Sequence, residues 1–183
     1  KVSESAAAIH VITQEDIRRS GALNIAEALR MAPGLDVARV DANKWAIGSR
    51  GFNGLYANKL LVLMDGRSVY SPLFSGVHWD AQDTLLEDID RIEVIRGPGA
   101  TLWGANAVNG VINIITKTAK DSQGALFTGG FGSEALGFGG IRYGGQINDQ
   151  AYYRVYAKGF DRDDFVDAAG RDAGAGEPAA RAA

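Results

Sequence analysis

The chain has 183 residues, of which 46% are hydrophobic and 22% charged, a composition that indicates a folded protein and excludes a disordered one. It contains no cysteine, which excludes disulfide bonds and thiolate metal sites. The formal net charge is -3, and no basic stripe is present that could follow a phosphate backbone, so nucleic-acid binding is not expected.

Hydropathy leaves the compartment open. No apolar run approaches the roughly 18 residues of a transmembrane helix, and the chain opens without a signal peptide. Two interpretations therefore stand side by side: a cytosolic protein, or a processed piece of an exported one.

Two short helices near the N-terminus are predicted from their capping residues. Thr13 has the character of an N-cap, and Asp16 at the third helical position completes a capping box for a helix over residues 14–20. Asn24 and Glu27 repeat the pattern for a second helix.

Alternating or β-branched residues predict strands at residues 9–12, 35–40, 45–52, 59–64, 91–96 and 111–116. The run over residues 59–64 has no polar alternation, so it predicts a central strand that is buried on both faces. Asp65 and Gly66 follow it as a type I′ hairpin turn, after which residues 67–70 return antiparallel.

Residues 71–82, SPLFSGVHWDAQ, form a segment of a different kind. Phe74, His78 and Trp79 follow neither a helical nor a strand period and lie among Pro, Gly and Ser. Such a loop either packs onto the core or displays its aromatic side chains to a ligand, and the sequence leaves both possibilities open.

Residues 90–117, DRIEVIRGPGATLWGANAVNGVINIITK, contain two strands separated by a Gly97-Pro98-Gly99 bend. The bend matches neither the dinucleotide-binding fingerprint nor the Walker loop in spacing, so a phosphate site is not expected. His10 and His78 lie far apart and no GxSxG elbow is present, so no metal site or catalytic triad is predicted.

Two arginines each end a predicted strand directly before a glycine, in Ser49-Arg50-Gly51 and in Ile95-Arg96-Gly97. They are either solvated strand ends or guanidinium forks aimed at a carboxylate on another element, which would hold two parts together. The neighbouring residues do not decide between these alternatives.

Beyond Lys117 the chain becomes rich in glycine, with nine of the 24 glycines between Gly124 and Gly145. Alternating segments of roughly ten residues are typical of transmembrane β-barrel strands, apolar toward lipid and polar toward the lumen; here they occupy residues 124–131, 136–147 and 151–160. An ordinary antiparallel meander fits the same pattern. The acidic, Ala- and Gly-rich residues 161–183 predict a loop.

Four blocks occur in one order: ITQEDIRRSGALNIAEALRMAPGLDV, IGSRGFNG, NKLLVLMDGRSVY and DIDRIEVIRGPGATLWGANAVNGVINIITK. Together, over roughly residues 9–118, they strongly resemble the plug domain of TonB-dependent outer-membrane receptors. The resemblance implies an α+β plug with a small mixed β-sheet and short helices at residues 1–120. The antiparallel β-strands at residues 121–183 are then about the first three strands of a transmembrane β-barrel, which is incomplete here, followed by the acidic loop.

The resemblance also implies an active transporter and not an enzyme, with no catalytic residue, cofactor or resident metal. In such receptors the plug gates the barrel lumen and helps to bind an extracellular iron–siderophore or similar scarce nutrient, which TonB-coupled force releases. The implied partners are TonB, through a segment missing from this fragment, the receptor's own C-terminal barrel, the small ligand and the bacterial outer membrane, with the plug in the lumen facing the periplasm. A ligand-sensing receptor with transcriptional signalling output, or a soluble binding domain with plug-like motifs, is the alternative.

The resemblance implies roles for three sets of residues. Those expected to anchor the plug to the barrel are Arg50, Arg96 and Glu93. The apical loops, expected over residues 43–54 and 70–79, carry the candidate ligand contacts Phe52, Asn53, Tyr70, Phe74, His78 and Trp79. The motif residues with an expected structural role are Gly51, Asp65, Gly66, Gly97, Pro98, Gly104 and Gly110.

Overall fold

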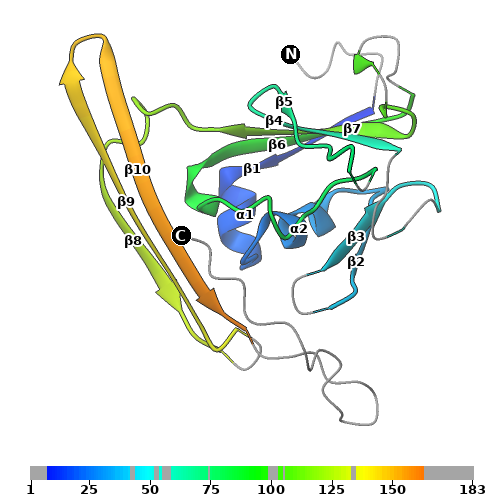
Figure 1. Cartoon of the computed structure of the whole chain (residues 1–183), viewed down its shortest axis with the longest axis horizontal. Coiled ribbons are helices and arrows are strands. Elements are labelled where there is room, and N and C mark those ends of the chain that lie inside the picture. The colour runs from blue at the N-terminus through cyan, green and yellow to red at the C-terminus, as the bar shows by residue number, and fades with distance from the viewer. Residues whose placement is uncertain are drawn as a thin grey trace. The chain divides into compact units, whose positions relative to one another are not determined.

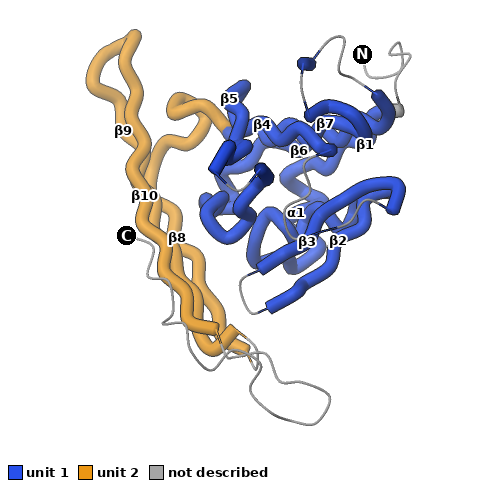
Figure 2. Tube along the Cα trace, turned by 45° about the vertical axis from the view of Figure 1, so that its right-hand side comes forward, with its two compact units in different colours: residues 1–116 blue, residues 117–183 orange. Residues whose placement is uncertain are grey.

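The computed structural model describes residues 8–41, 44–51, 54, 59–73, 75–98, 103–104, 106–132 and 135–162. The chain divides into two compact units, residues 1–116 and residues 117–183, which Figure 2 colours separately. Within the described residues, no helix is both long enough and apolar enough to cross a membrane.

The first unit is built on a five-stranded sheet with the strand order β1-β6-β7-β4-β5. These strands are β1 (Ala8–Thr13), β4 (Leu60–Met64), β5 (Arg67–Ser68), β6 (Ile89–Arg96) and β7 (Gly110–Thr116). Neighbours pair antiparallel except β4 and β7, which run parallel, so the sheet is mixed as predicted.

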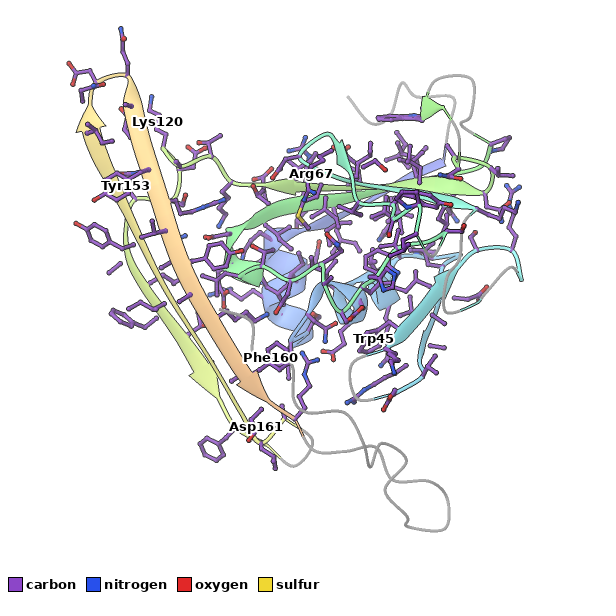
Figure 3. The ribbon with its side chains drawn as sticks, in the orientation of Figure 1. Trp45, Arg67, Lys120, Tyr153, Phe160 and Asp161 are labelled. Carbon is purple, nitrogen blue, oxygen red and sulfur yellow. The ribbon has the colours of Figure 1, made fainter. Side chains whose placement is uncertain are left out.

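Short helices and a second small sheet complete this unit. The helices α1 (Gln14–Ser20) and α2 (Ile25–Ala28) lie on one face of the five-stranded sheet (Figure 1). Strands β2 (Asp36–Arg39) and β3 (Trp45–Gly48) form a separate antiparallel pair, and the two 3-10 helices are η2 (Leu29–Met31) and η3 (Leu86–Asp88). The buried ring of Trp45, labelled in Figure 3, has the guanidinium carbons of Arg30 and Arg39 5.2 and 5.9 Å from its centroid, a cation–π arrangement.

Both faces of the five-stranded sheet are buried. The main core, on the helix side, includes Ile12, Ile17, Ile25, Leu29, Val62, Ile92, Ile112 and Ile114. The other face buries a smaller cluster of Leu61, Leu63, Ala107 and Val111, with Ile95 packed against it. Strand β4 contributes to both clusters, which confirms the prediction of a central strand buried on both sides.

The strand directions bring several chain segments to one end of the sheet. Strands β1, β4 and β7 begin there and β6 ends there, because Arg96 lies opposite Ala8 and Gly110, and Gly110 lies opposite Leu60. We call this the arginine end. The opposite end holds the Asp65-Gly66 turn and Thr116, whose backbone N–H and hydroxyl donate to the Asp65 carboxylate at 2.8 and 2.9 Å.

The local predictions that depended on turns and caps are confirmed, with one strand shorter than expected. Asp65 and Gly66 have φ values of 49° and 79°, as a type I′ turn requires, and Leu63 lies opposite Ser68. The returning strand β5 has only two residues, because the chain leaves the ladder after Val69 donates to the Val62 carbonyl at 3.1 Å.

The N-terminus of α1 carries a capping box whose strength depends on pH. The Thr13 hydroxyl and backbone N–H donate to the Asp16 carboxylate at 2.6 and 2.9 Å. These hydrogen bonds, the hydroxyl's first, hold the pKa of Asp16 below its ordinary value of 3.8. Since the folded-state pKa is the lower one, the contribution to stability is present above the unfolded pKa and is lost as the pH falls through the folded one.

We therefore expect acid to loosen α1 through this carboxylate. Protection of the α1 amides against hydrogen exchange in the intact protein should fall between about pH 5 and about pH 2, and Asp16→Asn should flatten that fall. Thr13→Ala, which removes the side-chain cap, is expected to cost α1 about 1 kcal/mol. Asp36→Asn, the same charge change on an exposed position of β2, serves as the control. An acid response that is the same with and without the Asp16 carboxylate would contradict the assignment.

The second unit is a three-stranded antiparallel sheet of β8 (Gly124–Gly130), β9 (Gly137–Asn148) and β10 (Ala151–Asp161), with β9 in the centre. The strand registers group the side chains by face. One face carries Ala125, Phe127, Ile141, Tyr143, Tyr153, Val155 and Ala157. The opposite face carries Leu126, Thr128, Arg142, Arg154, Tyr156 and Lys158.

The two faces differ in chemistry as the sequence alternation predicts. The first is apolar and open to the surroundings, with Phe127 73% and Val155 59% exposed. The second holds the three cationic side chains of the strands, and Arg154 donates to the Lys117 carbonyl at 2.9 Å. The ring of Tyr153, labelled in Figure 3, covers the backbone of Gly145 in the next strand, which explains the glycine there.

Candidate functional site

The two motif arginines lie near the arginine end of the sheet, and both are exposed. Arg96 is the last residue of β6, as predicted. Arg50 is not a strand end, because β3 stops at Gly48 and Arg50 follows in a turn with a φ of 59°. A residue with a Cβ is disfavoured in this left-handed region by roughly 1–2 kcal/mol, so the surrounding structure has to hold Arg50 there.

Ser49 supplies that constraint. It is buried, its hydroxyl donates to the Gly34 carbonyl at 3.0 Å, and its own carbonyl accepts from the Asn109 side-chain nitrogen at 3.2 Å. With both groups bonded, the peptide plane between Ser49 and Arg50 has a fixed orientation. That orientation sets the φ of Arg50.

The same neighbours reach Arg96. The Gly97 N–H donates to the Asn109 carbonyl at 3.2 Å, directly after Arg96. The Arg96 Cδ lies 3.3 Å from the position that a Cβ on Gly34 would take, so the aliphatic part of Arg96 lies against Gly34. Gly34, Ser49 and Asn109 therefore contact the segments of both arginines, and we call these three residues the arginine scaffold.

The arginine scaffold cannot be predicted from the sequence. Ser49 lies within the predicted strand over residues 45–52, and Gly34 lies in a Pro33-Gly34 pair, which usually indicates a turn. Asn109 precedes Gly110, and an Asn-Gly pair usually indicates a local turn, which conceals the long-range hydrogen bonds of its side chain. The one usable signal was that Ser49 directly precedes Arg50.

Glu93, expected to anchor the plug to the barrel, has hydrogen-bond partners within the sheet. One carboxylate oxygen accepts from Arg91 Nε at 2.8 Å and the other from the Asn113 side chain at 3.1 Å. Arg91 also donates to Asp90 at 2.6 Å. The hydrogen bonds to Glu93, and then to Asp90, raise the pKa of Arg91 above its ordinary value. Glu93 thus joins β6 to β7.

The candidate ligand contacts do not share one environment. Trp79 is 9% exposed and packs in the main core, so for this side chain the packing alternative holds: a large apolar ring gains more from burial than from display. Tyr70 and His78 are half-buried, with His78 Nδ1 3.9 Å from Asp80. Phe52, Asn53 and Phe74 lie outside the described residues. Leu73, in the same loop and not selected from the sequence, is 79% exposed.

The motif glycines are placed where a side chain would not fit the backbone or the packing. Gly51, Gly97 and Gly104 have φ values of 74°, 115° and 85°, and Pro98 follows Gly97 where β6 ends. Gly110, at the start of β7, has a normal backbone but no room, since a Cβ would lie 2.5 Å from the Ile95 carbonyl oxygen. Among the residues that the structure describes, no group of three or more His, Asp or Glu side chains is arranged to hold a metal ion.

Comparison with known proteins gives consistent matches. The family model described as TonB-dependent Receptor Plug Domain matches residues 1–111. The vitamin B12 transporter BtuB of Vibrio vulnificus is 32% identical over 136 residues, which cover 73% of this chain and 22% of that protein. The chain therefore spans about a fifth of the length of the curated relatives it matches.

Two solved structures have the same fold over most of the chain. The siderophore receptor PirA from Pseudomonas aeruginosa has a TM-score of 0.59 and 26% identity, covering 87% of this chain and 30% of that one. The ferric yersiniabactin uptake receptor FyuA from Yersinia pestis has a TM-score of 0.64, covering 87% of this chain and 25% of that one. Its identity is 20%, so this second likeness concerns the fold alone.

Proposed function

Because the chain belongs to the TonB-dependent receptor plug domain family, we propose that it is the plug and the first barrel strands of an outer-membrane active transporter. The family consists of transporters and receptors, and we assign no enzymatic activity. The observation that carries the proposal is the family match over residues 1–111. We assign residues 1–120 to the plug, and residues 121–183 to about the first three strands of the barrel and an acidic loop.

The second unit supports the barrel assignment. Its two faces separate exposed apolar side chains from Arg142, Arg154 and Lys158. A strand wall with lipid on one side and a polar lumen on the other has this alternation. The plug then lies in the lumen of a barrel in the bacterial outer membrane, where polar contacts hold it and the energised partner TonB displaces it.

Arg50 and Arg96 are the proposed anchors to that barrel. A guanidinium offers a planar fork that two carboxylate oxygens match, and such charge-assisted bonds are roughly twice as strong as neutral ones. Both side chains are exposed on the plug, and the strained φ of Arg50 supports a functional reason for its position. The barrel partners are carboxylates outside this chain.

The proposed cargo is a scarce nutrient, such as an iron–siderophore complex. An iron–siderophore is the first candidate, since PirA, at 26% identity, is named as a siderophore receptor. Cobalamin is the second candidate, favoured by the 32–34% identity to vitamin B12 transporters of two Vibrio species. Half-buried Tyr70 and His78, together with Phe52, Asn53 and Phe74, remain the proposed contacts.

Uptake measurements test the proposal. Cells whose only route for the nutrient is the full-length receptor should accumulate one labelled compound from a panel of cobalamin and ferric catecholate, hydroxamate and phenolate siderophores. We expect accumulation to fall by more than about tenfold in otherwise identical cells without TonB, because displacement of the plug requires applied force. Surface binding of the compound should persist in those cells. Accumulation that is equal with and without TonB would contradict the proposal.

A further inference from the structure

We propose that Asn109 is the positioning residue for both anchoring arginines, holding the backbone at Arg50 and at Arg96 so that the two guanidinium groups are presented together. The inference rests on the anchoring role proposed above and adds the residue that makes it possible. Asn109 itself is only 7% exposed, so it is proposed to act on the arginines and not to contact the barrel directly.

Asn109 joins three segments of the chain through hydrogen bonds. Its side-chain nitrogen donates to the Ser49 carbonyl at 3.2 Å, its backbone N–H donates to the Lys59 carbonyl at 2.8 Å, and its carbonyl accepts from Gly97 at 3.2 Å. One residue thus connects the turn after β3, the residue before β4 and the residue after β6, immediately before β7 begins.

The hydrogen bond from the Asn109 side chain constrains the backbone conformation of Arg50. A non-glycine residue with a φ of 59° is in a disfavoured conformation, which a free turn would leave. The hydrogen bond from Asn109 fixes the Ser49 carbonyl, and rotation of the Ser49–Arg50 peptide plane would break it. Removing that donor leaves a carbonyl in a buried residue without this partner and frees the peptide to turn, which redirects the Arg50 side chain.

The same scaffold also supports Arg96, from two sides. Asn109 binds the N–H of Gly97, and Gly34 supports the Arg96 side chain while accepting from the Ser49 hydroxyl. Bidentate recognition of a carboxylate needs both distance and direction, so a small rotation weakens it more than it weakens the plug core.

Asn113 provides a matched control for the experiment. It is also an asparagine, in the middle of β7, and its side chain also makes a hydrogen bond, in this case to Glu93 at 3.1 Å. Substitution of either residue by alanine removes the same atoms and one side-chain hydrogen bond. Asn113 does not contact the segments of the arginines through any hydrogen bond described above.

The test uses the full-length receptor in cells, with uptake per receptor in the outer membrane as the readout. We expect Asn109→Ala to lower uptake by about fivefold and Asn113→Ala by less than about twofold. In the background of Arg50→Gly, which tolerates the left-handed φ, Asn109→Ala should lower uptake by less than about twofold. The alanine removes only the side-chain hydrogen bond that orients Arg50, and it leaves the backbone bond to Gly97 in place. Full additivity in that background, or unchanged uptake for Asn109→Ala alone, would overturn the inference. If Arg50→Gly itself left uptake unchanged, the anchoring role would fail first.

Hydrogen exchange on the same purified receptors separates positioning from general loss of structure. Asn109→Ala should speed exchange by more than about tenfold at residues 49–51, and leave both α1 and Gly97, whose N–H bonds to the backbone carbonyl of residue 109, within about twofold. An equal rise over the whole of residues 8–116 would show a merely structural role and would also overturn the inference.

Discussion

Replacing Gly110 by alanine is expected to destabilise the first unit by about 3 kcal/mol, the largest effect that we expect from a methyl group added to a described glycine of this unit. The added Cβ would lie 2.5 Å from the Ile95 carbonyl oxygen and 3.4 Å from Leu60 Cδ2. Leu60 can adjust its side chain, but the Ile95 carbonyl belongs to the backbone of β6. The sheet has to open between β6 and β7 to admit the methyl group.

Hydrogen exchange of the β6 and β7 amides in the intact protein, at increasing denaturant concentrations, measures this change. Gly139→Ala is the control, since it adds the same methyl group in mid-strand but meets its nearest neighbour, the Thr128 carbonyl oxygen, at an ordinary 3.8 Å. We expect the control to change stability by less than about 0.5 kcal/mol. Equal protection for the two variants would contradict the prediction, because it would show that the sheet admits the methyl group at position 110 without opening.

The parts of the fold that the sequence predicts well are those decided by short-range interactions. The Thr13 and Asn24 caps bond to groups three residues away, and the Asp65-Gly66 turn joins adjacent strands. The burial of strand β4 could be predicted because a run without polar residues has no face that is suited to solvent. The alternation in β8 to β10 likewise predicted two chemically different faces, because the period of a strand needs no knowledge of its partners.

The candidate site is harder to predict from the sequence because its contacts join residues that are far apart in the chain. Asn109 and Ser49 are 60 residues apart, and no local sequence pattern near either residue predicts their hydrogen bond. Glu93 shows an intermediate case: Arg91 two residues earlier lies on the same face of β6 and was a foreseeable partner, whereas Asn113 comes from β7. The burial of Trp79 could not be predicted, because a segment without a period does not indicate which of its side chains turn inward.

Substituting both anchors, Arg50→Gly together with Arg96→Ala, is expected to lower uptake by the full receptor by more than about tenfold. Hydrogen bonds to charged groups contribute about 1.5–3 kcal/mol each, so losing two guanidinium partners exceeds the 1.4 kcal/mol that corresponds to a factor of about ten. Glycine is chosen at position 50 because it accepts the φ of 59° without strain. The backbone is thereby retained while the charge is removed.

The control removes the same two charges elsewhere on the plug, by Arg18→Ala together with Arg67→Ala. Both are exposed: Arg18 pairs with Glu15 on α1, and Arg67, labelled in Figure 3, follows the turn at the opposite end of the sheet. Surface pairs of this kind contribute about 0–1 kcal/mol, so uptake should change by less than about twofold. A general effect of plug charge would lower both variants equally. Loss of uptake in the anchor variant alone is the result that an anchoring role predicts, because the control leaves the arginine end intact.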